Sequence, residues 1–557
     1  MTWTKLALLA VTLGLTLLPP LALLDQQAAV SFERHAAYWC QAVLCVTWAL
    51  ALWRFMRGGR LAVALKQHYR LLALSISLAI LFAALLPQDL KIISDEVHLL
   101  NVSLGMYQDQ APLQATGGEF ADEELNYLST SFNRRPHLFP FLTHLAHHAT
   151  GYRVENVFAV NLLAGCALFL GTGLIAGQLI GGTATYCAPL LLSAVPALGS
   201  NITSGSFDTA NLACLAWTIL LLLRWRERPD AGLWPLLILT YGLLCHLRYE
   251  APIYALAALP VLWAVRRSPT HRADLISWYS ALAPLLLLPR LWRQPLFNLG
   301  WELTEGQWAF SLAGLADNSL ANLTALASTD PHMPNSLPVA VYALAGIALF
   351  FYRQQRANPS FLVVFTVFAV CWLIVSSATE GRFFIPANFR YTLPLYFTMS
   401  LGAAYFWHQV GHSATRKVGR IATVLPLALA LLTLGQSLPT TRSEYKLRIM
   451  TAPRERRLVL DYLADSGDNP LLVATRPGNT LLSGYDTWNP IYAEQHLPLL
   501  RQRIASGRTV YFIWGRDCEK KPRLCRPTIE AFDHHAKAHL DDDRAKVVLI
   551  ELEKRKN

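Results

Sequence analysis

The apolar run LLALSISLAILFAALLP at residues 71–87 continues directly into the polar segment QDLKIISDEVHLLNVSLGMY at residues 88–107. A run of this length without a charged residue predicts a membrane helix, because its side chains are more stable in lipid than in water. The polar segment brings Asp95 and Glu96 to the point where the chain leaves the bilayer. Ser94 can cap a helix that starts at Asp95, so the sequence predicts an acidic pair held at the membrane surface.

The composition of the whole chain agrees with a membrane protein. Of its 557 residues, 53% are hydrophobic and only 15% are charged, whereas about a quarter of the residues of a soluble domain are charged. The net charge of +11 would also suit a nucleic-acid partner, but the basic residues occur in short clusters between apolar runs. That distribution is typical of cytoplasmic loops, so we expect no nucleic-acid partner.

Apolar runs recur along most of the chain and predict an α-helical polytopic membrane protein with about thirteen transmembrane helices. Several runs are shorter than the roughly twenty residues of a full crossing, so their ends must extend into flanking polar residues. The predicted spans are Leu6–Leu24, Tyr38–Leu52, Leu71–Pro87, Val157–Leu179, Tyr186–Leu198, Thr209–Leu223, Leu233–Cys245, Pro252–Val265, Leu275–Leu288, Leu337–Phe351, Leu362–Ser377, Leu393–Phe406 and Ile421–Leu438.

The basic clusters predict the orientation of these helices, because Lys and Arg gather in the cytoplasmic loops of membrane proteins. Five clusters in alternate loops select one arrangement: the N-terminus is cytoplasmic, and the loops 88–156 and 295–336 and everything after Leu438 are outside the cytoplasm. The first span could instead be a signal peptide, which would leave this arrangement unchanged. The clusters are Arg54, Arg57, Arg60, Lys66 and Arg70; Arg224, Arg226 and Arg228; Arg266, Arg267 and Arg272; Arg353 and Arg356; and Arg416, Lys417 and Arg420.

The same pattern divides the chain into three parts. Residues 1–70 form an N-terminal membrane hairpin with a basic cytoplasmic loop, residues 71–438 form the transmembrane core, and residues 439–557 form a small extracytoplasmic α/β domain. In the last part, strand-like stretches such as LLVAT from Leu471 alternate with helical patterns, which predicts a parallel or mixed sheet.

Two cysteines stand apart from the rest, which lie in apolar stretches where a thiol behaves as a small hydrophobe. Cys518 and Cys525 flank the short polar loop EKKPRL. That spacing suits a disulfide better than a metal site, which would need more ligands nearby. A disulfide there would indicate an oxidising compartment.

The acidic pair has an ordinary explanation as well as a functional one, because Asp95 and Glu96 in the first turn of a helix would complement its dipole. The predicted spans, however, carry no Asp, Glu, Lys or Arg in their middle. Ion-coupled transporters usually keep such residues at membrane depth. The polar chemistry is therefore expected in the outer loops.

The order of motifs resembles the GT-C superfamily of polyprenyl-phosphate-sugar-dependent glycosyltransferases, above all its protein O-mannosyltransferase and lipid A aminoarabinose transferase branch. DEVH at residues 95–98 looks like the start of the first outer loop of the mannosyltransferases, and RRPHLFPFL at residues 134–142 is similar to the element that follows, without its doubled proline. CHLRYEAP from Cys245 and NFRYTLPLYF from Asn388 resemble the outer ends of later spans. The resemblance covers roughly residues 71–438, although two spans precede the acidic loop here rather than one.

The resemblance implies a lipid-linked donor whose phosphosugar lies at the outer membrane surface. Asp95 would be the general base that takes a proton from the acceptor, with inversion at the anomeric carbon. Glu96 would support Asp95 or help to bind a divalent ion such as Mg²⁺ or Mn²⁺, since some members of the superfamily use a metal.

The departing phosphate needs a compensating positive charge. Arg390 is the first candidate, followed by Arg382 and Arg248, because outer-side guanidinium groups suit a phosphate. Each of the three could equally be an arginine that anchors in lipid headgroups. Tyr391 belongs to the same candidate set, and candidate contacts to donor or acceptor are His98, Arg135, His137 and Glu250.

His144 and His148 are four residues apart on an expected helix and could share one metal ion. No carboxylate accompanies them at the intervening positions. A histidine cluster at a surface or interface is the more ordinary explanation, and the metal, if any, stays unidentified.

Three functions fit these observations. The first is a glycosyltransferase that moves a sugar from a polyprenyl-phosphate donor to a glycolipid, polysaccharide or protein on the periplasmic side of a bacterial inner membrane. The others are a transporter or flippase of lipid-linked sugars and a non-catalytic subunit of envelope assembly. The uncharged spans and the acidic pair favour the first. Asn101 begins a glycosylation sequon close to Asp95, where a glycan would obstruct the site, and this favours a bacterial chain.

Overall fold

A computed structural model of the chain describes residues 3–22, 25–57, 60–91, 94–121, 124–133, 135–230, 232–292, 311–328, 335–353, 359–378, 381–383, 386–418, 421–448, 451–466, 469–542 and 545–555. The chain forms two compact units, here called the helical unit and the sheet unit. The helical unit comprises Met1–Phe32, Trp39–Asp89 and Phe158–Leu447, and the sheet unit comprises Glu33–Tyr38, Leu90–Val157 and Arg448–Asn557.

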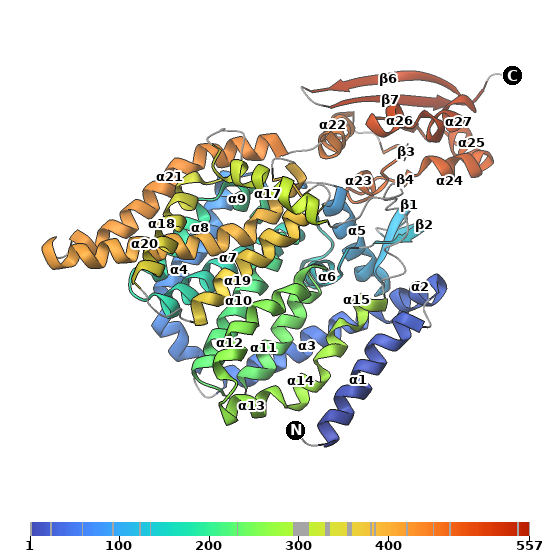
Figure 1. Ribbon diagram of the computed structural model, residues 1–557. Coiled ribbons are helices and arrows are strands. Elements are labelled where there is room, and N and C mark those ends of the chain that lie inside the picture. The colour runs from blue at the N-terminus through green and yellow to red at the C-terminus, as the bar shows by residue number, and fades with distance from the viewer. Residues whose placement is uncertain are drawn as a thin grey trace. The chain divides into compact units, whose positions relative to one another are not determined.

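The helical unit contains the segments predicted to cross the membrane (Figure 1). Within the described residues, each predicted span falls mostly on helical structure, and prolines divide several of them because proline removes a backbone donor and disrupts the preceding turn. Its helices are α1 (Trp3–Ala22), α3 (Ala37–Met56), α4 (Arg60–Leu85), α7 (Glu155–Leu179), α8 (Ala184–Ser193), α9 (Pro196–Ile202), α10 (Asp208–Glu227), α11 (Leu233–Cys245), η1 (Ala251–Ala258), α12 (Leu259–Val265), α13 (Pro269–Leu275), α14 (Trp278–Leu282), η2 (Ala283–Leu287), α15 (Leu288–Trp292), α17 (Leu312–Leu326), α18 (Leu337–Arg353), α19 (Pro359–Ser377), η3 (Pro386–Thr392), α20 (Leu393–Val418) and α21 (Ile421–Arg448).

The predicted count of thirteen spans is not confirmed. Within the described residues, five helices are both long and apolar enough to cross a bilayer, and four further apolar helices are shorter. The long segments are Ala37–Met56, Lys66–Leu85, Glu155–Leu179, Pro359–Ser377 and Val424–Arg442. The length shortfall arises where prolines break a predicted span, as Pro196 does between α8 and α9.

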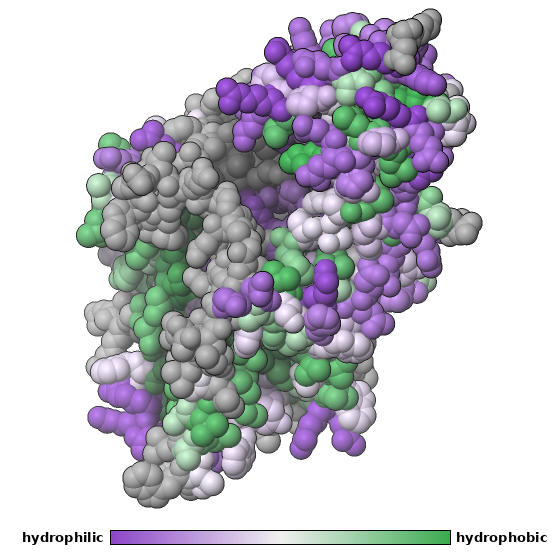
Figure 2. All heavy atoms as spheres, turned by 90° about the vertical axis from the view of Figure 1, so that its right-hand side faces the viewer, coloured by the Kyte–Doolittle hydropathy of each residue, from purple (hydrophilic) through white to green (hydrophobic). Residues whose placement is uncertain are grey.

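The surface of the helical unit carries many exposed apolar side chains, among them Leu163 (72% exposed), Trp263 (69%) and Leu344 (67%). Figure 2 shows one face of the molecule, on which hydrophobic patches and densely hydrophilic areas are both extensive. Apolar surface on this scale marks contact with lipid or another protein. Together with the long apolar helices, it supports a multi-pass membrane protein.

The sheet unit is built on one mixed sheet of seven strands in the order β2-β1-β4-β3-β5-β7-β6. Strand β3 is parallel to β4 and β5, and the other neighbours are antiparallel. The strands are β1 (Leu113–Ala121), β2 (Glu124–Phe132), β3 (Leu471–Val473), β4 (Thr487–Trp488), β5 (Val510–Trp514), β6 (Asp533–Asp541) and β7 (Lys546–Glu553). The helices of this unit are α5 (Ser94–Asp109), α6 (Leu138–Thr150), α22 (Thr451–Ser466), α23 (Gly478–Leu481), α24 (Pro490–Gln495), α25 (Leu497–Ala505), α26 (Arg516–Lys520), η4 (Pro522–Leu524) and α27 (Arg526–Glu530), while α2 (Gln26–His35) ends in it.

Two of these strands come from the predicted outer loop 88–156 rather than from the tail. The β1–β2 hairpin is joined to the tail through Glu119, which accepts a hydrogen bond from Trp488 Nε1 at 3.0 Å and pairs with Arg503 at 2.6 Å. Asn489 Nδ2 also donates to the Thr116 carbonyl oxygen at 2.8 Å. The outer loop and the tail therefore fold as one unit.

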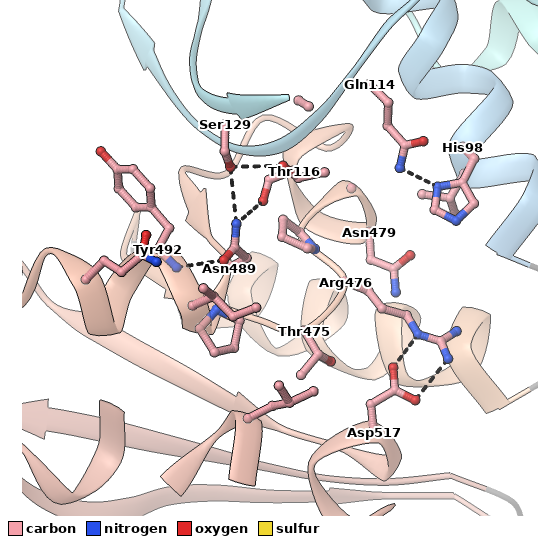
Figure 3. Close-up of a pocket in the computed structure, with 18 residues that line it drawn as sticks. His98, Gln114, Thr116, Ser129, Thr475, Arg476, Asn479, Asn489, Tyr492 and Asp517 are labelled. Carbon is pink, nitrogen blue, oxygen red and sulfur yellow. Dashed lines mark hydrogen bonds and ion pairs between the residues drawn. The ribbon is translucent and has the colours of Figure 1, made fainter. Parts of the chain in front are cut away.

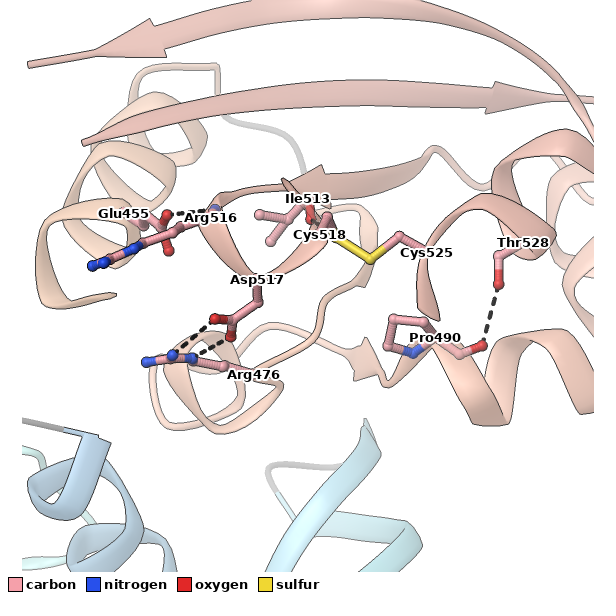
Figure 4. The surroundings of a disulfide bond; sticks show 9 residues. All are labelled: Glu455, Arg476, Pro490, Ile513, Arg516, Asp517, Cys518, Cys525 and Thr528. Carbon is pink, nitrogen blue, oxygen red and sulfur yellow. Dashed lines mark hydrogen bonds and ion pairs between the residues drawn. A yellow bond between two sulfur atoms is a disulfide. The ribbon is translucent and has the colours of Figure 1, made fainter. Parts of the chain in front are cut away.

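The tail also contains the pair of cysteines that the sequence singled out. A disulfide joins Cys518 to Cys525, both fully buried, with 5.7 Å between their Cα atoms. The link closes α26 onto the segment before α27 (Figure 4). It fixes the loop that follows β5.

Candidate active site

Asp95 and Glu96 lie in the first turn of α5, as predicted, but they are buried rather than exposed to solvent. Their residues are 4% and 1% exposed. Asp95 Oδ1 accepts a hydrogen bond from Arg135 at 2.6 Å, and Glu96 Oε2 accepts one from the Lys91 backbone N–H at 2.8 Å. A buried carboxylate is stable only when paired in this way, so helix-dipole complementation is not the whole explanation of this pair.

A chain of hydrogen bonds connects Arg135 to His98. The Arg135 backbone N–H donates to Asn133 Oδ1, Asn133 Nδ2 donates to Gln114 Oε1, and Gln114 Nε2 lies 2.6 Å from His98 Nδ1. The Arg135 N–H fixes the Asn133 side-chain oxygen, so the Asn133 amide group donates to the Gln114 oxygen. Gln114 then donates through Nε2, and His98 Nδ1 accepts. The proton of a neutral His98 is thereby placed on Nε2.

The neutral form of His98 is favoured electrostatically as well. Burial lowers the pKa of His98, and Arg135 and Arg476 lower it further against the opposing effect of Asp95. At neutral pH, His98 therefore offers a hydrogen-bond donor without a charge.

His137 is also buried, and its Nε2 lies 2.5 Å from Glu33 Oε2. Glu33 belongs to α2, in the predicted outer loop between the first two spans. The pair ties that loop to the start of α6. This contact gives His137 a structural role, and its predicted contact with donor or acceptor stays a prediction.

The histidines of α6 have protein partners. His144 Nε2 lies 3.0 Å from the Tyr38 hydroxyl, and His147 lies 3.1 Å from Ser103 Oγ through Nε2 and 2.8 Å from Asn156 Nδ2 through Nδ1. Burial lowers the pKa of both rings to about 4. Among the described residues, no three His, Cys, Asp or Glu side chains form a group that could hold a metal ion.

A second group of candidates gathers in the helical unit, where Arg248 pairs with both Asp208 and Glu250. Arg390 NH1 lies 4.0 Å from Asp208 Oδ2. The Arg248 guanidinium lies 4.7 Å from the centre of the Tyr391 ring, and that of Arg390 lies 5.2 Å from it. We call these five residues the arginine cluster.

The arginine cluster is formed by three chain segments: the N-terminus of α10, the turn after α11, and η3. The side chains of Arg248 and Arg390 are 6% and 7% exposed, too buried for arginines that only anchor in lipid headgroups. Arg382 differs, because it is exposed and donates through Nε to Asn318 Oδ1 at 3.1 Å. The structure therefore brings two of the three candidate arginines together.

Comparisons with known proteins match these observations. The family model described as dolichyl-phosphate-mannose-protein mannosyltransferase matches residues 134–292. The solved structure of ArnT from Cupriavidus metallidurans in the apo state is 13% identical, with a TM-score of 0.56, and covers 87% of this chain and 98% of its own. The same protein bound to undecaprenyl phosphate is 12% identical, with a TM-score of 0.54 and the same coverage.

The fold is similar to that of ArnT, and the family match covers residues 134–292, so the chain resembles the GT-C glycosyltransferases. The resemblance inferred from the sequence is thus confirmed. An oligosaccharyltransferase of Archaeoglobus fulgidus is 11% identical over 89% of this chain and 74% of its own, with a TM-score of 0.48. No curated protein sequence matches the chain.

Two residues with buried ionic partners were missed by the sequence analysis. Asp208 immediately precedes a predicted span in SGSFDTAN, where an acid at the outer end of an apolar run was the available signal. Glu33 lies 104 residues from its partner His137. A contact at that separation leaves no local pattern in the sequence.

Proposed function

We propose that the chain transfers a sugar from a polyprenyl-phosphate donor to an extracytoplasmic acceptor, with Asp95 as the general base. The observation that carries this proposal is a buried carboxylate at the start of α5, held by Arg135, directly after a membrane-spanning segment. A carboxylate fixed in this way can accept a proton from a bound hydroxyl or amine. The undecaprenyl phosphate bound to the similar ArnT supports a polyprenyl-phosphate donor here.

The reaction requires one bond to form and one to break. The acceptor oxygen or nitrogen donates an electron pair to the anomeric carbon, while the bond between that carbon and the phosphate oxygen breaks and its electron pair leaves with the phosphate. Asp95 takes the acceptor proton. Attack opposite the leaving phosphate inverts the anomeric centre.

In this proposal, the two guanidinium groups of the arginine cluster donate hydrogen bonds to the phosphate. Arg390 and Arg248 are held by stacking near Tyr391 and by the carboxylates of Asp208 and Glu250. Their positions are therefore set before substrate binds, which is the condition for electrostatic stabilisation of a leaving group. We assign donor-phosphate binding to these two arginines, with Arg382 in a supporting role at most.

The proposed steps use no divalent ion. Glu96 is buried and already accepts a backbone hydrogen bond, and the described residues supply no cluster of three ligands. The carboxylate set therefore does not fit a dedicated metal site. Dialysis against EDTA tests this directly: loss of transfer that Mg²⁺ or Mn²⁺ restores would establish a metal requirement.

The deciding experiment follows sugar from a radiolabelled polyprenyl-phosphate donor into envelope extract. Purified wild-type protein should label an acceptor fraction. A chain that moves the donor between leaflets of a vesicle without labelling any acceptor would be a flippase, and one that does neither would be an assembly subunit.

We further propose a bacterial inner membrane location with a cytoplasmic N-terminus and a periplasmic sheet unit. A fluorescent reporter that matures only in the cytoplasm should stay dark when fused after Asn557. A bright fusion would place Asp95 on the cytoplasmic side and contradict the assignment.

A further inference from the structure

The sheet unit contains a cavity of about 710 Å³ that the reaction described above does not use. Ligand sites commonly have volumes of roughly 300–1,000 Å³. Its walls come from α5, β1, β2 and the segments that follow β3, β4 and β5 (Figure 3). Because these last three strands are parallel, their carboxyl ends meet at one edge of the sheet, which is where α/β sheets usually bind ligands.

Helix α5 forms one wall through Val97 and His98. It packs closely on the start of α23, since a Cβ atom at Gly478 would lie 3.2 Å from Val97 Cγ1 and 3.1 Å from Asn101 Nδ2. His98 and Asp95 are three residues apart on α5, so they lie on the same side of the helix. The helix that carries the proposed base therefore also lines the cavity.

The charges in the cavity wall cancel. Arg476 donates to both carboxylate oxygens of Asp517, at 2.6 and 3.0 Å (Figures 3 and 4). His98 is the remaining titratable side chain with a protonation change near neutral pH, and its environment favours the neutral form. A cavity without net charge is poorly suited to phosphate and better suited to an uncharged polar ligand.

Several polar side chains in the cavity wall can hydrogen-bond to a ligand. Thr475, Asn479 and Gln495 line the cavity, and within the described part of the chain their side chains make no hydrogen bond. By contrast, Asn489 is committed to Thr116 and Ser129. Thr475, Asn479 and Gln495 therefore offer hydroxyl and amide groups to a ligand, and the hydrogen bonds of Asn489 hold the wall beside them in place.

An aromatic ring completes the wall. Tyr492 stacks on His496 with ring centres 4.0 Å apart and meets Trp488 edge-on at 5.2 Å. Both contacts fix the ring, which lines the cavity beside the amide groups. Amides and hydroxyls match the hydroxyl groups of a sugar, and a tyrosine beside them adds an apolar surface and a further hydroxyl to the wall.

We propose that this cavity binds an uncharged, hydroxyl-rich saccharide, which is the glycan part of the acceptor. The assignment to the acceptor rests on the proposed transferase function, whereas saccharide binding itself does not. If the saccharide is part of the acceptor, the possible acceptors are restricted to molecules that already carry sugar.

Saturation-transfer NMR on the purified full-length chain tests the binding. The probes are cellobiose, mannobiose and di-N-acetylchitobiose, with inorganic phosphate as an anionic competitor. At least one disaccharide should receive saturation, and phosphate at equal concentration should not displace it. Absence of transfer to all three, or displacement by phosphate, would overturn the proposal.

The double variant Thr475→Val with Asn479→Ala removes two ligand-binding groups and should weaken disaccharide binding about tenfold. Gln502→Ala, at an exposed position on α25 outside the cavity, should bind as wild type. Equal melting temperatures of all three proteins would show that folding is unchanged. Equal affinities of the double variant and the control would assign the binding to another surface.

Asp95→Asn separates this proposal from the transferase proposal, because it should lose transfer and keep disaccharide binding. In the double variant, the KM for acceptor should rise about tenfold while the KM for donor stays unchanged. If wild-type protein binds the disaccharide but transfers no sugar, the saccharide site stands and the transferase function fails. If wild-type protein transfers sugar but binds no disaccharide, the transferase function stands and the saccharide site fails.

Discussion

The Asp95–Arg135 pair of the sheet unit and the arginine cluster of the helical unit both bury opposite charges, but the two groups differ in size. Asp95 Oδ1 accepts a charge-assisted hydrogen bond from Arg135 at 2.6 Å. The arginine cluster holds two arginines and two carboxylates around one tyrosine ring. The first arrangement orients one carboxylate, and the second holds two guanidinium groups in place with two carboxylates.

The proposed function assigns the two groups different roles, proton transfer to Asp95 and phosphate binding to the arginines. A general base needs hydrogen-bond reach to the proton of its acceptor, whereas a leaving phosphate is stabilised by guanidinium groups fixed in advance. Substitutions at the two places should therefore change different quantities. Base variants should lower the rate of transfer, and cluster variants should change stability and donor binding.

The largest effect is expected for Asp95→Asn. The substitution keeps the size of the side chain but removes the proton acceptor, so the transfer rate should fall by about 100- to 10,000-fold. Radiolabel transfer from the polyprenyl-phosphate donor, at equal protein level in the membrane, measures this. Wild-type turnover would end the assignment of Asp95 as the base.

Glu96→Gln is the matched control, because it makes the same chemical change one residue away. Glu96 accepts a backbone hydrogen bond from Lys91, and a glutamine oxygen can accept it as well. The loss of rate should be much smaller than for Asp95→Asn. An equal loss would indicate that both carboxylates bind an essential metal ion.

The next largest effect concerns stability of the arginine cluster. Asp208→Asn removes one carboxylate from the buried Arg248 and should destabilise the protein by roughly 3–5 kcal/mol. Thermal unfolding in detergent measures it, with the exposed Asp317→Asn on α17 as a control. Adding Arg248→Met should recover part of the loss, because the unpaired charge is then gone. No recovery would mean that Asp208 stabilises the fold in some other way.

A smaller effect is expected for Arg390→Ala. Losing one charge-assisted contact to phosphate should cost about 1.5–3 kcal/mol, or about ten- to a hundredfold in donor KM. Arg382→Ala should change donor KM less, since Arg382 is exposed and bonded to Asn318. Arg266→Ala, which removes an exposed arginine next to Trp263, should have no effect. Unchanged donor KM in Arg390→Ala would contradict phosphate binding by this residue.

The sequence predicted those features that depend on local pattern. Apolar runs predicted the positions of the helices, and stretches such as LLVAT and VYFIW, with the alternating helices, predicted a sheet in the tail. The β1–β2 hairpin was missed because its polar residues alternate with few apolar ones and because Gly117 and Gly118 interrupt it. Its register shifts around Gly117, which no periodic pattern reveals.

Candidate site residues could be predicted only where they belonged to a short sequence motif. Asp95, Arg248 and Arg390 stood in short motifs whose order suggested their roles, but the pairing of Arg135 with Asp95 depends on a contact 40 residues apart. Asp208 looked like the polar flank of a span, because its partners belong to other segments. Folding decides such pairings, and they cannot be read from spacing.

The last prediction concerns the pH dependence of stability. Buried histidines pack near α5, whereas the arginine cluster contains no histidine, so acid should destabilise the sheet unit through these histidines. Burial lowers the pKa of His144 and His147 to about 4, while an unfolded histidine titrates near about 6.5. Between these values the unfolded state binds more protons, so stability is lost as pH falls from about 6.5 to about 4 and levels off below that. Melting temperatures from pH 7.5 to 4 should show this decline, with a shallower slope for His147→Gln, whose amide can still reach Ser103 or Asn156. Parallel curves for variant and wild type would mean that His147 is not responsible for the acid sensitivity of the sheet unit.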